Sequence, residues 1–453
     1  TFIPPQVGTY EFTVIAYDPY DNLPGVSISV DVYDLDGGES HSLALKPDGS
    51  VWSWGTGLNG QLGDGAISTR PEPARVHLFE HLDGGADAGT APFTAVAIAS
   101  GRSHSMALTG DGRVLAWGSD NAGQLGNGSS SSQDVYSPHL VCDVGASDCE
   151  ANPLTNIVAI TAGYEFSAAL RDDGTVVAWG YNSDGQVGDG TFNHAHSPVR
   201  VCAPGTVAPC STFLSGIVSL SAGGGGHTLA RTATGRVWSW GFNKSGQVGQ
   251  GDQGNVYERI NIPNRVCAQG ETFPCAAFLD NVIAVDAWSG HSLALRNDGV
   301  LWGFGGNDEH ELGAVTNTVC HSATSCSPSP TPVCGNSGCT TPLNNVIGFS
   351  AGRRFSVAVK ADGSVWSWGD NDSSQIGDGT IDPRSFPTRV CAPGTTAPCV
   401  LFLSDIRAIA TGNFHVLALQ SDGTLWSWGE NNQGQTGIDG FVDILVPTEV
   451  TGF

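Results

Sequence analysis

The stretch HSLALKPDGSVWSWGTGLNGQLGDG, residues 41–65, decides the fold of this chain. On both sides of the Asp48-Gly49 pair, apolar residues return at every second position. This period of two is typical of half-buried β-strands. Asp-Gly is a strong hairpin signal, because a type I′ turn requires positive φ at both central residues. The stretch therefore predicts an antiparallel β-hairpin.

The same pattern occurs seven times in register. A Trp-Gly pair, or Phe-Gly in one copy, recurs every 60–64 residues, at Trp54, Trp117, Trp179, Trp240, Phe304, Trp368 and Trp428. Thirteen residues before each of these lies His41, His104, Phe166, His227, His291, Phe355 or His415. Six residues after the Gly of each pair lies Gln61, Gln124, Gln186, Gln247, Glu311, Gln375 or Gln435. Because Phe replaces His twice, we expect the His side chains to pack in the core and to make a hydrogen bond there.

Each copy predicts a sheet of four strands. One further strand precedes the hairpin, as at 157–163, and another follows it, as at 197–201, where Pro198 fits only an edge strand. One such sheet cannot bury both of its faces, but seven sheets arranged radially cover one another. We therefore predict an all-β fold over residues 34–453, a seven-bladed β-propeller with four-stranded antiparallel blades.

Composition and charge restrict the function. The chain of 453 residues contains 62 Gly and only 14% charged residues, which suits strands and turns better than helices. Its formal net charge is −25, with no run of basic residues. Because nucleic-acid binding depends on Lys and Arg, we expect no nucleic-acid partner. No apolar stretch approaches the roughly 20 residues that cross a bilayer, so we expect no membrane insertion.

The repeat H-S-L-A-L-x-x-D-G-x-V-W-S-W-G-x-x-x-x-G-Q-L-G-D-G resembles the RCC1 repeat, named for the regulator of chromosome condensation. The resemblance covers residues 34–453 in seven copies. It implies a seven-bladed propeller, in agreement with the pattern itself. It implies less about function, because the family includes a nuclear GTPase exchange factor, a plant ultraviolet receptor and secreted bacterial enzyme inhibitors.

Residues 1–33 lie outside the repeat. The segments 8–18 and 26–32 look similar to the last two strands of a bacterial Ig-like or PKD-type domain, and two strands cannot form such a domain alone. We therefore expect residues 1–33 to be the end of a truncated larger domain, with an N-terminal hairpin packed on the propeller as the alternative. The segment 26–33 could equally be the inner strand of the first blade, and Asp31, Asp34 and Asp36 make a weak inner strand in this region.

All twelve cysteines lie between the repeats and form short pairs. Zinc sites would require C-x2-C pairs with His or a second pair nearby, and these are absent. We therefore predict six loop-closing disulfides: Cys142–Cys149, Cys202–Cys210, Cys267–Cys275, Cys320–Cys326, Cys334–Cys339 and Cys391–Cys399. Because disulfides persist in oxidising compartments, we expect an extracellular, cell-surface or periplasmic protein.

The topology of a blade sorts its loops between two faces. The loop before each His and the G-x-N-x-x-G-Q segment share one face, and the Asp-Gly hairpins and the disulfide loops share the other. Arg, Tyr and Trp, which are enriched in interface hot spots, occur just before the His position in several copies. We predict a binding patch around the central opening that is formed by Arg102, Tyr164, Glu165, Trp288, Arg353, Arg354, Asn413 and Phe414. Packing of Trp288 in the core is the alternative.

The sequence contains no recognisable constellation for catalysis. It has no Walker loop, G-x-S-x-G elbow or H-E-x-x-H motif. His194 and His196 lack a third metal ligand, and the stretch 182–190 lacks the ligand ladder of a Ca²⁺ loop. We therefore expect no enzyme activity, catalytic residue, metal site or cofactor.

The leading functional hypothesis is a secreted, bacterial, non-enzymatic propeller that binds a protein or a surface glycan. We expect it to be a monomer within a larger multidomain chain. One alternative is a guanine nucleotide exchange factor-like regulator of a small GTPase, and another is an inhibitor of a secreted enzyme such as a β-lactamase. The predicted disulfides oppose a cytoplasmic or nuclear exchange factor.

Overall fold

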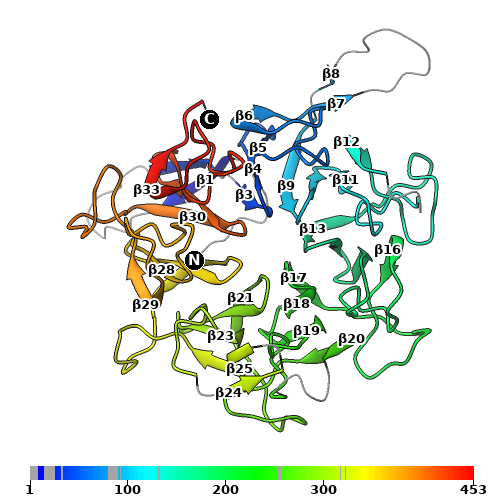
Figure 1. The fold of residues 1–453 in the computed structure, drawn as a ribbon. Coiled ribbons are helices and arrows are strands. Elements are labelled where there is room, and N and C mark those ends of the chain that lie inside the picture. Colours follow the sequence, from blue (N-terminus) through cyan, green and yellow to red (C-terminus); the bar gives the residue numbers. More distant parts are fainter. Residues whose placement is uncertain are drawn as a thin grey trace, which may run out of the picture.

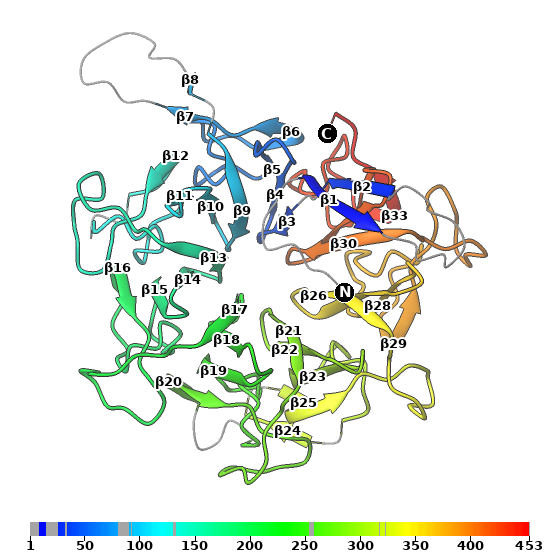
Figure 2. The ribbon, with the colours of Figure 1, turned by 180° about the vertical axis from the view of Figure 1, so that it is seen from behind.

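The fold is that of a computed structural model, which describes residues 9–14, 26–31, 34–79, 90–91, 93–129, 133–252, 258–316, 318–321 and 323–452. Seven antiparallel sheets stand radially around a central axis, and Figures 1 and 2 show this ring from its two sides. The prediction of an all-β, seven-bladed propeller is confirmed. In each blade the strands lie side by side, with the first strand nearest the axis and the later ones nearer the rim. The blades are numbered 1–7 in chain order.

The strands occupy corresponding places in the seven blades. The inner strands are β3 (Asp34–Gly37), β9 (Ala95–Ser100), β13 (Ile157–Ala162), β17 (Ile217–Ala222), β21 (Val282–Ala287), β26 (Val346–Ala351) and β30 (Ile406–Thr411). The second strands are β4 (His41–Leu45), β10 (His104–Thr109), β14 (Phe166–Arg171), β18 (His227–Thr232), β22 (His291–Arg296), β27 (Phe355–Lys360) and β31 (His415–Gln420). The third strands are β5 (Val51–Gly55), β11 (Val114–Gly118), β15 (Val176–Gly180), β19 (Val237–Phe242), β23 (Leu301–Gly306), β28 (Val365–Gly369) and β32 (Leu425–Gly429). The outer strands are β6 (Arg70–Arg75), β12 (Val135–Leu140), β16 (Ala195–Arg200), β20 (Arg259–Arg265), β25 (Ala323–Pro332), β29 (Arg384–Arg389) and β33 (Ile444–Glu449).

A few strands depart from this scheme. Blade 5 has a fifth strand, β24 (Thr318–Cys320), outside β25, and β7 (Leu78–Phe79) pairs with β8 (Thr90–Ala91) in the linker between blades 1 and 2. Ahead of the ring, β1 (Thr9–Val14) pairs with β2 (Val26–Asp31) in a sheet of its own. The inner strand of blade 1 is therefore β3 and not the segment 26–33. Among the described residues, no helix is long and apolar enough to cross a membrane.

The hydrophobic core is divided among the seven interfaces between blades. Each interface holds one cluster of buried apolar side chains from two neighbouring blades, and each cluster contains Phe304 or one tryptophan of the Trp-Gly pairs. Trp179 of blade 3, for example, is fully buried against Met106 and Leu108 of blade 2. A buried Trp removes about 150–250 Å² from water. A blade therefore depends on its neighbours for its largest apolar contacts.

A polar contact, which we call the carbonyl clamp, accompanies these clusters. The backbone carbonyl of Gln124 accepts hydrogen bonds from the next blade, from Ser167 Oγ at 2.9 Å and from Trp179 Nε1 at 2.9 Å. Because the Ser167 hydroxyl donates to this carbonyl, it accepts the hydrogen bond from His104 Nε2, at 2.9 Å. The predicted role of the His position, a buried side chain with a hydrogen bond, is confirmed at His41, His104, His227, His291 and His415.

Where Phe replaces the His of a clamp, the residue of the next blade that would pair with this His can change as well. Phe355 of blade 6 and Val416 of blade 7 lie in the same apolar cluster, so neither an imidazole nor a hydroxyl is left unpaired. At the five remaining His positions, burial lowers the pKa to about 3. These imidazoles therefore stay neutral at physiological pH.

The ring closes without exchange of a strand between blades. Trp54 Nε1 and Ser42 Oγ of blade 1 donate to the Gln435 carbonyl of blade 7, at 2.9 and 2.8 Å. His415 Nε2 lies 2.8 Å from Ser42 Oγ. Leu35 shares an apolar cluster with residues of blade 7. The first and last blades are thus joined by the same clamp that joins blades 2 and 3.

Several carboxyl groups are buried at these interfaces. Near the axis, Asp36 accepts a hydrogen bond from Ser100 N of blade 2, at 2.7 Å, and burial raises its pKa to about 8. Glu311 occupies a position that is Gln in the other six copies, and its side chain accepts a hydrogen bond from Glu309 N at 2.9 Å. Burial raises the pKa of Glu311 to about 7. The folded protein therefore favours the protonated form of these groups.

The carbonyl clamp predicts a non-additive pair of substitutions. Ser167→Val should destabilise the fold by about 1–3 kcal/mol, because it leaves the buried Nε2–H of His104 without an acceptor. His104→Phe together with Ser167→Val should recover much of this loss, since blades 6 and 7 combine Phe and Val in this way. Denaturant unfolding of the four proteins in this double-mutant cycle gives the coupling energy. Simple additivity of the two losses would contradict the clamp.

Glu311 predicts a pH-dependent stability. Its folded-state pKa of about 7 exceeds the ordinary value of 4.5, so the folded chain retains a proton that the unfolded chain releases between these values. The stability of the fold should therefore fall as the pH rises through this window. Glu311→Gln should raise the free energy of unfolding at about pH 8, by an amount on the order of 2 kcal/mol, and change it little at about pH 4. Equal shifts at both pH values would contradict this assignment.

Candidate binding face

The loops between inner and second strands, called here the inner loops, surround one mouth of the ring. Their backbones are hydrogen-bonded from blade to blade. Arg353 N donates to Asn413 O at 3.1 Å, and Asn413 N donates to Gly38 O at 3.2 Å. Arg102 N in turn lies 3.3 Å from Gly163 O and bonds to it. With the bond from Glu39 N to Arg102 O at 3.4 Å, this series joins the inner loops of blades 6, 7, 1, 2 and 3.

Trp288 of blade 5 closes the remaining part of this mouth. Only 8% of it is exposed, and its Nε1 donates to Asn413 Oδ1 of blade 7 at 3.1 Å. Gly224 of blade 4 leaves room for the ring, because a Cβ there would lie 3.3 Å from the indole. Trp288 and Asn413 are thus buried and form a floor under the exposed residues of the inner loops.

Arg102 organises one side of the mouth above this floor. Its Nε lies 2.7 Å from Glu39 Oε2, and its NH1 lies 3.5 Å from Glu165 Oε1. Its guanidinium carbon stands 4.3 Å from the centre of the Tyr164 ring, which is 39% exposed. Burial raises the pKa of Tyr164, so its hydroxyl remains a hydrogen-bond donor at neutral pH. The cluster holds an accessible aromatic side chain in place.

Arg353 and Phe414 organise the other side. The guanidinium carbon of Arg353 lies 5.3 Å from the centre of the Phe414 ring. Both residues border a groove of about 410 Å³ between blades 6, 7 and 1, which is lined by Glu39, Ser40, Thr56, Leu58, Arg353, Asn413, Phe414, Glu430, Asn432 and Gln433. Arg354 is exposed beside them, with its NH1 3.7 Å from Glu309 Oε1.

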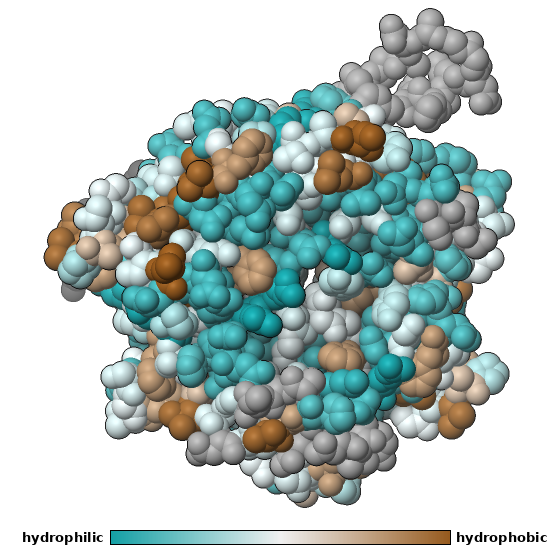
Figure 3. Space-filling view, viewed as in Figure 1, coloured by the Kyte–Doolittle hydropathy of each residue, from teal (hydrophilic) through white to brown (hydrophobic). Residues whose placement is uncertain are grey.

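The chemistry of this face suits binding. Accessible aromatic and Arg side chains lie beside amides and carboxylates, and Tyr and Arg are enriched in interface hot spots. On the side of the ring shown in Figure 3, hydrophilic residues surround the centre and strongly hydrophobic residues lie mostly toward the rim. No group of three or more His, Cys, Asp or Glu in the described part of the chain is placed to hold a metal ion. The buried histidines of the clamp cannot contact a substrate.

The structure places the eight predicted residues around one mouth of the ring, but in two different roles. Arg102, Tyr164, Glu165, Arg353, Arg354 and Phe414 are at least partly accessible, whereas Trp288 and Asn413 are buried. The pattern missed Glu39 and Glu430, which line the groove. Pairing Glu39 with Arg102, which holds the same place in the next copy, could have revealed the first of these.

The G-x-N-x-x-G-Q segment lies with the inner loops, as expected, since Thr56, Leu58, Asn432 and Gln433 line the same groove as Arg353 and Phe414. Its later part then runs down between the blades, because its Gln carbonyl belongs to the buried clamp. Its end meets the disulfide loop of the following linker, as where Cys391 N donates to Gly377 O at 3.0 Å.

The twelve cysteines form six disulfides in the pairs given above. Five lie in linkers between blades. Cys320–Cys326 is the exception to the expected face, since it joins β24 to β25 at the rim of blade 5. Six disulfides are typical of an oxidising compartment.

Known proteins share this architecture. A family model described as RCC1-like domain matches residues 16–397, and the regulator of chromosome condensation (RCC1) repeat matches residues 406–435 and 422–453. The chain belongs to the RCC1-like domain family. Proteins of this family are generally binding scaffolds, which agrees with the inner-loop face.

Individual relatives cover most of the chain. The ultraviolet-B receptor UVR8 of Arabidopsis thaliana is 27% identical over 419 residues, which are 91% of this chain and 80% of the receptor. The mitochondrial RCC1 domain-containing protein RUG3 of the same plant is 30% identical over 417 residues, 88% of this chain and 82% of RUG3. The structure of yeast RCC1 (Prp20) bound to Kap60 gives a TM-score of 0.66 at 19% identity and covers 93% of this chain and 85% of that chain. This structural likeness shows the fold alone.

The buried floor of the RCC1-like mouth predicts a graded response to substitution of Trp288. Trp288→Ala should destabilise the fold by about 3–5 kcal/mol, because it leaves a cavity. Trp288→Phe should cost only about 1 kcal/mol, mainly through the lost hydrogen bond to Asn413. Thermal unfolding of the two variants measures the difference. Two equally small losses would mean that the indole is not part of the core.

Proposed function

We propose that this chain is a non-enzymatic binding scaffold that acts in an oxidising compartment, secreted, at a cell surface or in the periplasm. In this proposal the inner-loop face binds a protein partner, or a surface glycan. The chain would act as a monomeric module of a larger bacterial protein, to whose preceding Ig-like domain residues 1–33 would belong. The observation that carries the proposal is the gathering of Tyr164, Arg102, Arg353 and Phe414 around one mouth over a buried floor.

The electrostatics of the groove support a partner with polar and positively charged groups. Burial raises the pKa of Glu430, and the nearby charge of Asp443 raises it further. The Glu430 carboxyl accepts hydrogen bonds from Asn432 and Gln435. Glu39 faces the same groove. A cationic partner group would relieve the repulsion among these carboxylates. The apolar surfaces of Phe414 and Leu58 would supply contact area beside it.

The alternatives have less support. Yeast Prp20 has binding properties toward Gsp1p and histones. The six disulfides weigh against an exchange factor that works in the cytoplasm or nucleus. Inhibition of a secreted enzyme would use the same face and the same compartment, so it remains one form of the proposed protein binding.

A comparison of two triple variants tests the proposal. Tyr164→Ala/Arg353→Ala/Phe414→Ala removes the exposed part of the face. Arg113→Ala/Val207→Ala/Phe273→Ala makes matched changes at exposed residues of a hairpin and of two disulfide loops. Each protein is immobilised and screened against a glycan array and the secreted and surface proteins of the source organism.

We expect at least one ligand whose affinity falls more than tenfold in the first variant and stays unchanged in the second. A ligand retained by the first variant and lost by the second would contradict the proposed face. Release of nucleotide from a small GTPase by the unmodified protein would instead establish the exchange-factor alternative.

A further inference from the structure

The first residue of the outer strand fills a defined place in two of the blades. In blade 1, Arg70 opens β6 and reaches under the segment between the third and outer strands. Its NH1 lies 2.5 Å from Asp64 Oδ2, and its NH2 donates to Ser53 O at 3.0 Å. The guanidinium thus bridges the segment and the sheet.

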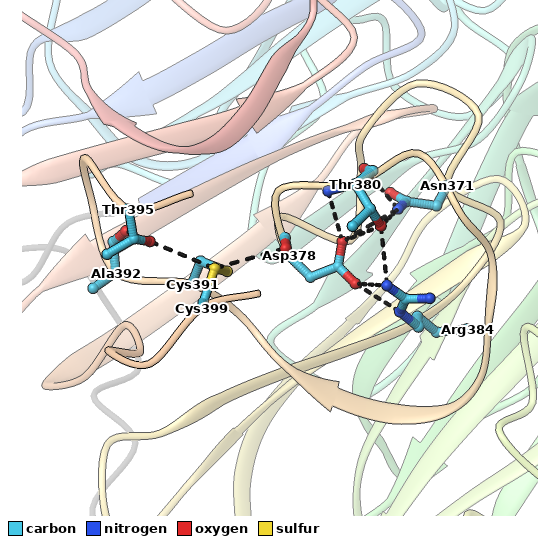
Figure 4. The surroundings of a disulfide bond; sticks show 8 residues. All are labelled: Asn371, Asp378, Thr380, Arg384, Cys391, Ala392, Thr395 and Cys399. Atoms are coloured by element: carbon cyan, nitrogen blue, oxygen red, sulfur yellow. Dashed lines mark hydrogen bonds and ion pairs between the residues drawn. A yellow bond between two sulfur atoms is a disulfide. The ribbon is translucent and has the colours of Figure 1, made fainter. Parts of the chain in front are cut away.

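Blade 6 repeats this arrangement beside a disulfide. Arg384 opens β29, and its Nε donates to Asp378 Oδ2 at 2.6 Å while its NH2 donates to Thr380 Oγ1 at 3.0 Å. Only 7% of Asp378 is exposed. Figure 4 shows the guanidinium against this carboxylate, next to Cys391–Cys399. Two blades therefore use one arginine for the same place.

In blade 2 no arginine occupies the corresponding place at the start of the outer strand. Strand pairing sets Val135 opposite Gly118, as it sets Arg70 opposite Gly55 in blade 1. In the Gly-x-Gly turn of the segment, Asn127 stands where blade 1 has Asp64. A cavity of about 310 Å³ lies here, lined by Ala116, Leu125, Asn127, Val135, His139, Leu140, Ser147, Asp148, Cys149 and Glu150.

The lining of this cavity is apolar inside and acidic at the rim. Ala116 and Leu125 are buried. Asp148 and Glu150 come from the Cys142–Cys149 disulfide loop and the residue after it, and no Lys or Arg lines the cavity. Glu150 forms no hydrogen bond or ion pair with any residue that the structure describes. The cavity therefore offers negative charge that nothing in its lining neutralises.

His139 adds a directed acceptor. Its Nδ1–H donates to the carbonyl of Ser137 at 2.7 Å, because a carbonyl oxygen can only accept. In the neutral ring, Nε2 is then left as a hydrogen-bond acceptor. An acceptor and two carboxylates suit a group with several N–H donors.

We propose that the cavity of blade 2 binds the guanidinium of an arginine side chain that a protein ligand supplies. The arginine takes the place that Arg70 and Arg384 fill within their own blades. The apolar walls pack along its methylene stem, and Asp148 and Glu150 pair with its head. A lysine fits less well, because its ammonium cannot make two parallel hydrogen bonds to a carboxylate. This site lies at the rim of blade 2 and does not depend on the inner-loop face.

The test uses a small probe and its neutral isostere. Nα-acetyl-arginine amide is titrated into the full chain by calorimetry, and Nα-acetyl-citrulline amide serves as the uncharged comparison. One variant, Asn127→Asp/Val135→Arg, gives blade 2 the internal pair of blades 1 and 6. A second, Asp148→Asn/Glu150→Gln, removes the charge of the rim. Glu72→Gln/Asp382→Asn changes two exposed carboxylates elsewhere and is the matched control.

We expect saturable binding of the arginine probe, at least tenfold weaker binding of the citrulline probe, and unchanged binding in the control. The internally paired variant should bind at least tenfold more weakly while its melting temperature stays the same or rises. If it fails to fold, the rim variant decides, and its affinity should fall at least threefold. Absence of saturable binding, equal affinity for citrulline, or full affinity in the rim variant or in a folded paired variant would overturn the proposal.

Discussion

One backbone carbonyl in each blade carries the connection to the next blade. At Gln61, as at Gln124, it accepts hydrogen bonds from a hydroxyl and an indole of the following blade. Donors and acceptor therefore come together only when two blades stand side by side. The apolar clusters have the same dependence, since each is built from two blades. Stability in this ring is thus a property of interfaces, as in other repeat proteins, and the closing interface is equivalent to the rest.

This constraint determines where the sequence can vary. A change at a clamp position can be matched by a change of its partner, as Phe355 and Val416 illustrate. Opposite Phe166, the partner Thr228 instead keeps its hydroxyl, which still donates to the Gln186 carbonyl. The exposed residues of the inner loops and the first residue of the outer strand in blade 2 carry no such obligation. Arg102 and Tyr164 of the mouth and Val135 of the rim lie at these freer positions. The candidate binding sites therefore lie at positions where the residue type varies most among the seven copies.

The sequence could predict the fold because the strict positions are the buried ones. The spacing of His, Trp and Gln encodes one interface, and seven copies encode the ring. The burial of Trp288 was predicted only as the alternative, because its partner Asn413 lies 125 residues away, two blades further on. The buried role of the Gln carbonyl was not predicted for the same reason, since its donors belong to another copy. Contacts between copies are invisible when each copy is considered alone.

The disulfides complement the interfaces instead of reinforcing them. Each closes a loop between cysteines only 5–8 positions apart, so each contributes about 2 kcal/mol through the entropy of the unfolded chain. Such short loops restrain a linker or a rim hairpin, and the disulfide bonds themselves join no two blades. In blade 2, the restrained linker carries Asp148 and Glu150 to the edge of an open cavity. An oxidising compartment would therefore act on this protein mainly by fixing the geometry of its rim, while the ring itself is held by the carbonyl clamps.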